Sequence, residues 1–373
     1  ITLLAPHYLP RLIQQNPPMQ AAIPAGVALE NSPGLWRINR WMDGRFQAQR
    51  TNYLRDELNL RSVGIRLRNE ALYRLFNRNA NPKASVGKNG FLFETTYLNA
   101  HAGLYDRPDS VLSQQAERIK ALHDLLESQG TQLLVLLPPP KGYVYPEEMP
   151  DSYQRLMPTS NDRQHLHQQL TALGVPCMDF SFYKTERESY PALVYPKTGL
   201  HWSHYGAFVG VDSLRATLGR MLGKPLPRMQ IDSLRFTNRL RPPDNELAVI
   251  SNLWSAYPYD SLAYPHYHIE SDSLTYQPNV LAIGDSYYRL WFDAGYLEGL
   301  FSPDSELWFY YGSRFKQAFP EGRGLDKSPE VLKASVAAAD IVILEGSATF
   351  HHNLGFDFVE QYVGLFGQHP IHP

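Results

Sequence analysis

The sequence has very little cysteine, no excess of charge of one sign and no long apolar segment. Its 373 residues include a single cysteine, Cys177, so no disulfide can form within the chain. The 35 basic and 37 acidic residues nearly cancel, and no long run of one sign occurs, which argues against a nucleic-acid-binding surface. The longest apolar runs fall well short of the roughly 20 residues that cross a bilayer.

Apolar and aromatic residues are plentiful. Hydrophobic residues make up 43% of the chain, charged residues 19% and aromatic residues 12%, a balance typical of a globular protein and not of a disordered one. At about 150 residues per domain, the length allows one large domain or two. The aromatic excess suits a sugar-stacking or partner-binding surface, and it suits an aromatic-rich core equally well.

Composition and the pattern of predicted elements divide the chain into two parts. Residues 1–84 carry many early prolines and then arginine-rich segments without β-α-β alternation, so we expect a mainly helical N-terminal extension. The segment GKNGFLF at 87–93 predicts an Asn-Gly turn that leads into a short strand. We therefore expect a main domain over 85–373, with an irregular, proline- and tyrosine-rich insertion at about 222–279.

The main domain alternates predicted helices and strands. A helix that starts near Asp109 and closes at Gly130 leads directly into the unbroken apolar run at 133–137, which is typical of a parallel strand covered on both faces. Further strands are expected at 175–179, 280–283, 307–311 and 341–344, and further helices at 162–173, 287–297 and 329–339. This alternation predicts an α/β fold with a mostly parallel central sheet.

A candidate nucleophile follows one of these strands. The triplet Gly284-Asp285-Ser286 lies between the strand at 280–283 and a helix, and the carboxyl ends of strands are where open α/β sheets place their sites. A serine at such a turn is exposed, and the N–H groups of the helix can stabilise an oxyanion. Taken alone, the triplet is explained more often as an ordinary helix cap.

A candidate base precedes another helix. His201 lies in KTGLHWSHYG at 197–206, just before a helix expected to run to about Leu222. A histidine at such a junction can point into a cleft and accept a proton from a serine, because its pKa lies near working pH. The alternative is a histidine that only packs against the start of the helix.

The histidine pairs do not predict a metal site. His201 and His204 could suggest zinc, but the chain has no HExxH pattern and no third ligand nearby. His351 and His352 are more typical of a solvated loop. We therefore expect neither metal nor cofactor.

With these motifs in order, the chain resembles the SGNH-hydrolase-like proteins of the alginate O-acetyltransferase group. Ser286 and His201 match the nucleophile and base of that group, and the histidine precedes the serine, as in its permuted order. The resemblance runs over about residues 85–350. It rests further on GKNGFLF at 87–93, PKGYVYP at 140–146 and ADIVILE at 339–345.

The resemblance implies a three-layer α/β/α sandwich and a carbohydrate O-acetyltransferase that works through a serine acyl-enzyme. It further implies a polysaccharide acceptor, a membrane-bound O-acyltransferase that supplies the acetyl group, and a periplasmic or cell-surface location, with an anchoring N-terminal membrane segment absent from this chain. Two alternatives stay open: a carbohydrate acetylesterase with the same Ser/His pair, and a non-catalytic glycan-binding or scaffold protein.

One position departs from the group's pattern. The group has Asp-x-His-Trp, whereas this chain has Gly199 in place of the aspartate that orients the histidine. Loss of that acid costs a serine protease a factor of about 10⁴ in turnover. We expect Glu345 or Asp179 to supply the acid; a backbone carbonyl that orients His201, or loss of catalysis, are the alternatives. Asp285 is a third and less attractive candidate, because adjacent side chains at a sharp turn usually diverge, and its carboxylate is expected to hold the turn.

The remaining site residues are expected from their positions. Gly284 and Tyr287 flank the serine and are expected to support the oxyanion. Trp202, Tyr288 and Lys141 are candidates for substrate contact; core packing for the aromatic residues and a surface ion pair for Lys141 are the alternatives.

Overall fold

The computed structural model describes residues 35–57, 60–158, 160–255 and 257–367. Its chain forms two compact units. The smaller unit contains the chain up to Val86 together with Asn245–Pro258, and the larger contains Gly87–Asp244 and the chain from Tyr259 onward. The first division lies two residues from the boundary expected at 84.

The smaller unit is mainly helical. Its hydrogen bonds join α4 to the segment around α12, since Asn69 Nδ2 donates to the Ser251 carbonyl at 3.0 Å and the Tyr73 and Tyr257 hydroxyls lie 3.0 Å apart. The helical character expected for the extension is present from residue 35 onward, while the proline-rich part expected before it lies outside the described residues. Its elements are α2 (Ile38–Met42), α3 (Arg45–Glu57), α4 (Leu60–Phe76), β1 (Ala84–Val86) and α12 (Glu246–Ser251).

A seven-stranded sheet forms the centre of the larger unit, in the order β10-β9-β8-β7-β11-β3-β4. The five strands from β8 to β4 are all parallel, and β9 and β10 add an antiparallel edge that the sequence did not predict. The strands are β3 (Gln132–Leu136), β4 (Cys177–Met178), β7 (Val280–Gly284), β8 (Glu306–Phe309), β9 (Ser313–Lys316), β10 (Phe319–Gly324) and β11 (Ile341–Glu345).

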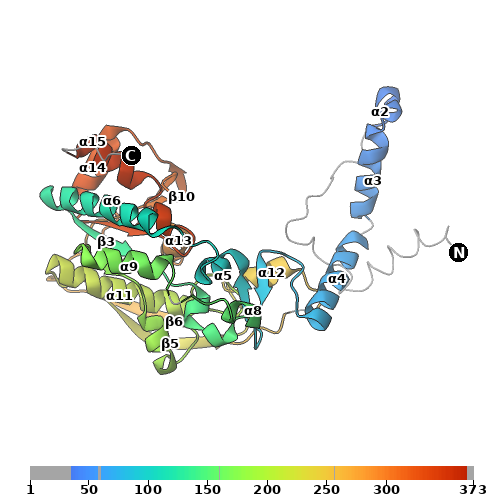
Figure 1. Cartoon of the computed structure of the whole chain (residues 1–373), viewed down its shortest axis with the longest axis horizontal. Helices are drawn as coiled ribbons and strands as arrows, with labels where there is room; N and C mark the ends of the chain where they lie inside the picture. Colours follow the sequence, from blue (N-terminus) through green and yellow to red (C-terminus); the bar gives the residue numbers. More distant parts are fainter. Residues whose placement is uncertain (1–34, 58–59, 159, 256, 368–373) are drawn as a thin grey trace. The chain divides into compact units, whose positions relative to one another are not determined.

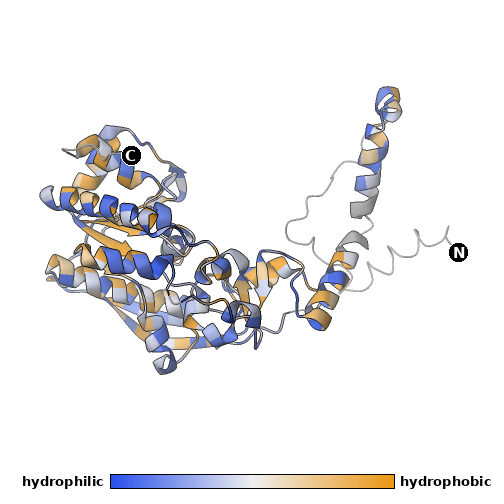
Figure 2. Cartoon of the chain, viewed as in Figure 1, coloured by the Kyte–Doolittle hydropathy of each residue, from blue (hydrophilic) through white to orange (hydrophobic). Residues whose placement is uncertain are grey.

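Helices cover both faces of the sheet, which confirms the predicted three-layer arrangement (Figure 1). Successive side chains of β11 point to opposite faces: Ile341 and Ile343 belong to one apolar core, Val342 and Leu344 to the other. The strands are accordingly apolar on both sides, as Figure 2 shows. On one face lie α11 (His204–Leu222) and α13 (Ser286–Asp293); on the other lie α6 (Asp109–Ser128), α9 (Asp162–Ala172), α14 (Pro329–Ala338) and α15 (Phe358–Phe366).

Short elements connect these layers. The turn predicted before the first strand of the domain is present, with Asn89 at φ 48° and Gly90 at φ 79°, a region that Asn and Gly tolerate best. The short elements are β2 (Leu92–Glu94), α5 (Thr95–His101), α7 (Lys141–Val144), α8 (Asp151–Gln154) and α10 (Phe182–Thr185), with 3₁₀ turns at Pro146–Glu148, Arg187–Ser189 and His351–Asn353. None of the described helices is both long and apolar enough to cross a bilayer.

The expectation of an irregular insertion at 222–279 is wrong. Two long strands, β5 (Arg228–Thr237) and β6 (Leu262–Glu270), pair antiparallel along their whole length. Apolar side chains of this ribbon pack beside α11, where the rings of Phe208 and Tyr267 lie 5.3 Å apart. The pattern was hidden because the other face of β6 is polar and solvated, and because Pro265 interrupts its apolar alternation.

Candidate active site

Ser286 is the first residue of α13, and one residue, Asp285, separates it from the fully buried strand β7. Asp285 caps the helix, since its side chain accepts the Tyr287 N–H at 2.8 Å. Gly284 is required by a close approach: a Cβ there would lie 2.8 Å from Glu345 Oε2. The strand-to-helix turn therefore presents the serine at the carboxyl edge of the sheet, where the sequence predicted it.

The structure brings His201 to this serine across 85 residues of chain. His201 Nε2 lies 2.8 Å from Ser286 Oγ, within the range for proton transfer to a general base. The imidazole is largely buried and packs against the Tyr287 ring, with centroids 4.9 Å apart. Tyr287 also donates from its hydroxyl to the Leu200 carbonyl at 3.3 Å, which ties the histidine loop to the serine helix.

Lys141 fixes the loop that carries His201. Its ammonium is buried and donates to the carbonyls of Pro196 at 2.9 Å, Lys197 at 3.2 Å and Gly199 at 2.5 Å. The prediction placed Lys141 in contact with substrate or in a surface pair. The structure gives it a different task, because three backbone acceptors surround its charge in the interior.

Gly199 stands where the family pattern has its acid, and the space for a side chain is filled. A Cβ on Gly199 would lie 2.9 Å from the carbonyl oxygens of both Pro243 and Asp244. Asp244 is itself buried, and its carbonyl accepts the Thr198 hydroxyl at 2.9 Å. Backbone from the segment between β5 and β6 therefore occupies the position that an aspartate would need.

Two of the three candidate acids support the serine turn. Glu345, at the end of β11, accepts the Asp285 N–H at 2.7 Å and is fully buried. Burial, and then the neighbouring Asp285 carboxylate, raise the pKa of Glu345 well above its usual value, which favours the protonated acid. Asp285 accepts the N–H of Ser347 at 2.9 Å as well as its hydroxyl.

The third candidate acid lies elsewhere. Asp179 follows β4, which is three places from β7 in the sheet. Its carboxylate accepts the Ser181 N–H at 3.0 Å and pairs with Arg163 at 3.4 Å. At about 4.8 Å per strand, Asp179 is separated from the serine strand by roughly 14 Å.

The aromatic residues expected to contact substrate lie in the core. Trp202 is 0% exposed and Tyr288 is 2% exposed. Trp202 stacks on Trp291, with ring centroids 4.7 Å apart, and meets Tyr287 edge-on. A ring buried on all sides cannot stack on a sugar, so these side chains support the site by packing in the core beneath it.

Three residues near the serine were missed by the sequence reasoning. Tyr97 and Ser347 share a hydrogen bond of 2.7 Å, and Ser347 continues this chain of contacts to Asp285. Tyr310 donates its N–H to the Gly284 carbonyl at 2.9 Å, and hydrogen bonding to Ser286 opposes the rise that burial causes in the pKa of Tyr310. Tyr310 and Ser347 follow strands β8 and β11, the two neighbours of β7, so strand ends were the signal available.

The structure also locates a possible metal cluster away from this site. In the described parts of the chain, one group of donor atoms has ligand-like spacing, formed by His123, Asp124 and Glu127 on α6. Lys120 already binds the Asp124 carboxylate there, at 2.6 Å. An exposed group of this kind is common without an ion, so it marks no metal centre.

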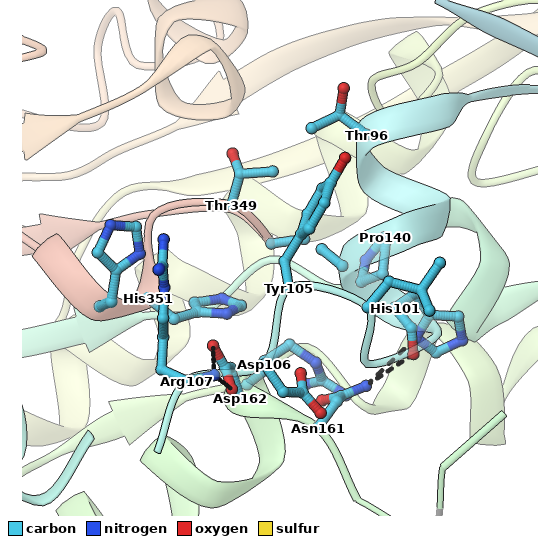
Figure 3. A pocket seen from close by; sticks show the side chains of 15 residues that line it. Thr96, His101, Tyr105, Asp106, Arg107, Pro140, Asn161, Asp162, Thr349 and His351 are labelled. Carbon is cyan, nitrogen blue, oxygen red and sulfur yellow. Dashed lines mark hydrogen bonds between the residues drawn. The ribbon is translucent and has the colours of Figure 1, made fainter. Parts of the chain in front are cut away.

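A cavity of about 340 Å³ opens near the ends of β3 and β11 (Figure 3). Ala348 and Thr349, just past Ser347, line it, as do Thr96 and Pro140. The cavity is rich in side chains that can donate and accept hydrogen bonds.

Comparison with known proteins identifies the family. A family model described as SGNH hydrolase-like domain, acetyltransferase AlgX, matches residues 84–298, a range that includes both His201 and Ser286. The chain is 24% identical over 180 residues to a probable alginate O-acetylase AlgJ of Pseudomonas syringae pv. tomato, a match that covers 48% of this chain and 44% of that protein. The chain thus spans less than half the length of this curated relative.

Solved structures with a similar fold include three bacterial proteins. The O-acetyltransferase domain of Pseudomonas putida AlgJ is 19% identical with a TM-score of 0.46, covering 73% of this chain and 93% of that one. Pseudomonas aeruginosa AlgX is 18% identical with a TM-score of 0.48, covering 76% and 66%. Bacillus cereus PatB1 is 12% identical with a TM-score of 0.43, covering 72% and 97%. Because the family model matches more than half of the chain, the protein belongs to the family of AlgX-type SGNH hydrolase-like acetyltransferase domains.

Proposed function

We propose that this protein is a carbohydrate O-acetyltransferase that acts on an extracytoplasmic polysaccharide through an acyl-enzyme on Ser286. The observation that carries the proposal is the 2.8 Å contact between Ser286 Oγ and His201 Nε2 at the carboxyl edge of the sheet. Membership of an acetyltransferase family supports the choice of acyl group.

In the first half-reaction, His201 Nε2 accepts the proton of Ser286 as Oγ attacks the acetyl carbonyl of the donor. The bond to the leaving group then breaks, and His201 returns the proton to that group. In the second half-reaction a sugar hydroxyl attacks the acetyl-serine, His201 takes the hydroxyl proton, and Ser286 departs with a proton restored to it. The product is an acetyl ester on the sugar.

The oxyanion of each tetrahedral intermediate would form at the start of α13. Preorganised N–H groups at a helix N-terminus stabilise such charge. The Tyr287 N–H is already bound by Asp285, so Tyr287 and Gly284 support the turn and leave the oxyanion to other donors. Glu345 and Asp285 act on the serine turn, because they accept the backbone N–H groups of Asp285 and Tyr287.

The physiological setting follows from the relatives. One is named a probable alginate O-acetylase, which supports a polysaccharide acceptor for this chain. A periplasmic or cell-surface location is what the family resemblance implies. A membrane-bound O-acyltransferase is the expected source of the acetyl group, as the family resemblance implies.

The test is turnover of p-nitrophenyl acetate by the full chain, compared with Ser286→Ala and His201→Gln. We expect both variants to lose at least about 100-fold in kcat/KM, since they remove the nucleophile and the base. Equal rates in wild type and Ser286→Ala would remove the enzyme assignment in favour of a binding protein. Acetylated oligosaccharide detected by mass spectrometry would separate transfer from hydrolysis by an acetylesterase.

A further inference from the structure

The cavity of Figure 3 lies along the same sheet edge as Ser286. β11 is the strand between β7 and β3, and the cavity is lined by Ala348 and Thr349 beyond β11 and by Pro140 beyond β3. At a strand spacing of about 4.8 Å, the cavity begins roughly 5–10 Å from the serine strand. Its wall continues directly from Ser347, whose N–H and hydroxyl bind Asp285 beside the nucleophile.

His351 is the unusual group of this cavity. The imidazole is 2% exposed, and within the described residues neither ring nitrogen makes a hydrogen bond of normal geometry. The backbone of Gly346 is the polar group beside it, and it opposes part of the fall in the His351 pKa. Buried polar atoms are nearly always satisfied, and leaving one unpaired destabilises the fold. Burial lowers the pKa of His351 to about 3, so the neutral ring has one N–H donor and one acceptor nitrogen to offer.

The remaining walls supply further donors and acceptors. Asn161 is buried and its amide contacts His101 Nδ1 at 3.3 Å, while Asp162 accepts the Arg107 N–H at 3.1 Å. Burial, followed by the neighbouring Asp106 carboxylate, raises the pKa of Asp162 to about 6. Carboxyl groups, amides and imidazoles therefore face the same space.

Charge and shape narrow the class of ligand. Two basic residues, Arg107 and Arg163, and two acidic residues, Asp106 and Asp162, line the cavity, so it has no strong excess of one sign. A volume of about 340 Å³ lies at the lower end of the range for small-ligand sites, roughly 300–1,000 Å³. Tyr105 is 46% exposed and stands among the lining side chains in Figure 3, where its ring can lie against an apolar ring face.

We propose that this cavity is a subsite for one pyranose ring of the acceptor glycan, with His351 hydrogen-bonded to a ring hydroxyl and Tyr105 packed against the ring. Sugar hydroxyls donate and accept together, which matches the mixed donors and acceptors better than a simple ion does. The subsite rests on the proposed acyl transfer, since it holds the sugar that receives the acetyl group from Ser286.

The experiment measures transfer from p-nitrophenyl acetate to two defined hexasaccharides, an oligomannuronate and maltohexaose, by the full chain. We expect at least one to be acetylated with saturable dependence on sugar concentration. His351→Gln should raise the half-saturating sugar concentration at least fivefold and leave turnover without sugar within twofold of wild type. His268→Gln is the matched control, because that histidine is about half exposed on β6 and pairs with Asp232.

A second variant, at the exposed residue Tyr105, keeps the proposal testable if substitution of the buried His351 prevents folding. Tyr105→Leu should also raise half-saturation, and its thermal midpoint should stay near that of wild type. Wild-type half-saturation in both variants, or no acetylation of either sugar despite Ser286-dependent turnover, would overturn the subsite.

Loss of the proposed function has a separate signature, which is absence of Ser286-dependent turnover. In that case saturation-transfer NMR with the same two hexasaccharides tests sugar binding at the subsite independently of acyl transfer. Binding that His351→Gln weakens supports it, and no binding overturns it.

Discussion

Glu345 shows how a single carboxyl can shape the site through the backbone of the serine turn. It accepts the Asp285 N–H at 2.7 Å from a fully buried position. Its raised pKa means that the neutral acid is the favoured form. Gly284 permits this contact because a larger residue would meet Glu345 at 2.8 Å.

A neutral isostere should therefore replace Glu345 at little cost. We expect Glu345→Gln to keep kcat for p-nitrophenyl acetate within about threefold, because its amide oxygen can still accept the Asp285 N–H. Glu345→Ala should lose roughly 1–3 kcal/mol of unfolding free energy, since it leaves a buried N–H unpaired. Chemical denaturation and steady-state kinetics measure both. A Gln variant as impaired as the Ala variant would show that the ionised carboxylate is needed.

Restoring the family's acid at Gly199 should fail. A Cβ there would lie 2.9 Å from the Pro243 and Asp244 carbonyls, so Gly199→Asp brings overpacking and a buried charge close to two acceptor oxygens. We expect at least about 3 kcal/mol of destabilisation, with no gain in turnover. Gly199→Ala is the control that carries the overpacking without the charge. Wild-type stability in the Asp variant, measured by urea denaturation, would show that the loop can move aside.

At the residue scale the sequence predicted that Ser286 and His201 come together, and it did not predict their surroundings. Ser286 and His201 stood in recognisable motifs at element junctions. Lys141 was misassigned because nothing in its motif reveals that its ammonium turns inward to three carbonyls. Burial of a long charged side chain depends on acceptors supplied by distant segments.

The elements around the site are a strand, a helix and a loop held in register by a few polar contacts. The loop before α11 depends on Lys141, and the start of α11 is capped by Ser203, which accepts the Gly206 N–H at 3.0 Å. A close contact at Gly206, where a Cβ would lie 2.1 Å from the Val194 carbonyl, sets the approach of this helix to the chain before it.

Removing the Lys141 ammonium should loosen this loop. Lys141→Met retains the apolar stem but leaves buried carbonyls unpaired, at a cost of about 1–3 kcal/mol. We expect kcat for p-nitrophenyl acetate to fall about tenfold or more with little change in KM, because His201 would no longer be held near Ser286. The control is Lys88→Met, at a position where a more exposed lysine pairs with Asp151 at 2.6 Å. A change confined to KM would instead indicate substrate contact by Lys141.

Element prediction succeeded where the apolar pattern was continuous. The buried parallel strands β3, β7 and β11 were identified within one or two residues, because both their faces are covered. The β5–β6 ribbon was missed because one face is polar. The edge strands were missed because β9 has only four residues and because β10 is largely exposed and contains a proline and two glycines.

For the whole molecule, two compact units make one chain, and the larger one contains the complete Ser/His pair. Its interior also holds neutral histidines. His101 and His351 are almost fully buried, and burial lowers the pKa of His101 to about 4 and that of His351 to about 3. The unfolded chain protonates these residues near pH 6.5, so the stability that they contribute is complete above that pH and is lost as the pH falls toward 4.

A histidine variant should expose this dependence. As the pH falls from 6.5 to 4.5, wild type should lose unfolding free energy through His101, and His101→Gln should not. The difference in unfolding free energy between the two proteins should therefore shift in favour of the variant, by at most about 1.4 kcal/mol per pH unit. The comparison with wild type is needed because Asp162, whose pKa is raised to about 6, acts in the opposite direction between about pH 4 and 6. Glu345, whose pKa is also raised, acts in the same direction as Asp162. Urea denaturation at several pH values measures it; a difference that does not change with pH would mean that His101 titrates alike in both states.

The sequence by itself determined the α/β class, the helical extension from residue 35, the serine turn and the histidine loop, because these depend on periodicity and on motifs a few residues long. Only the tertiary structure decided that Ser286 and His201 lie 2.8 Å apart, that Gly199 has no room for a side chain, and that Glu345 serves the serine turn. Each of these depends on segments 40 or more residues apart being packed against one another, and no local pattern encodes the space that such packing leaves.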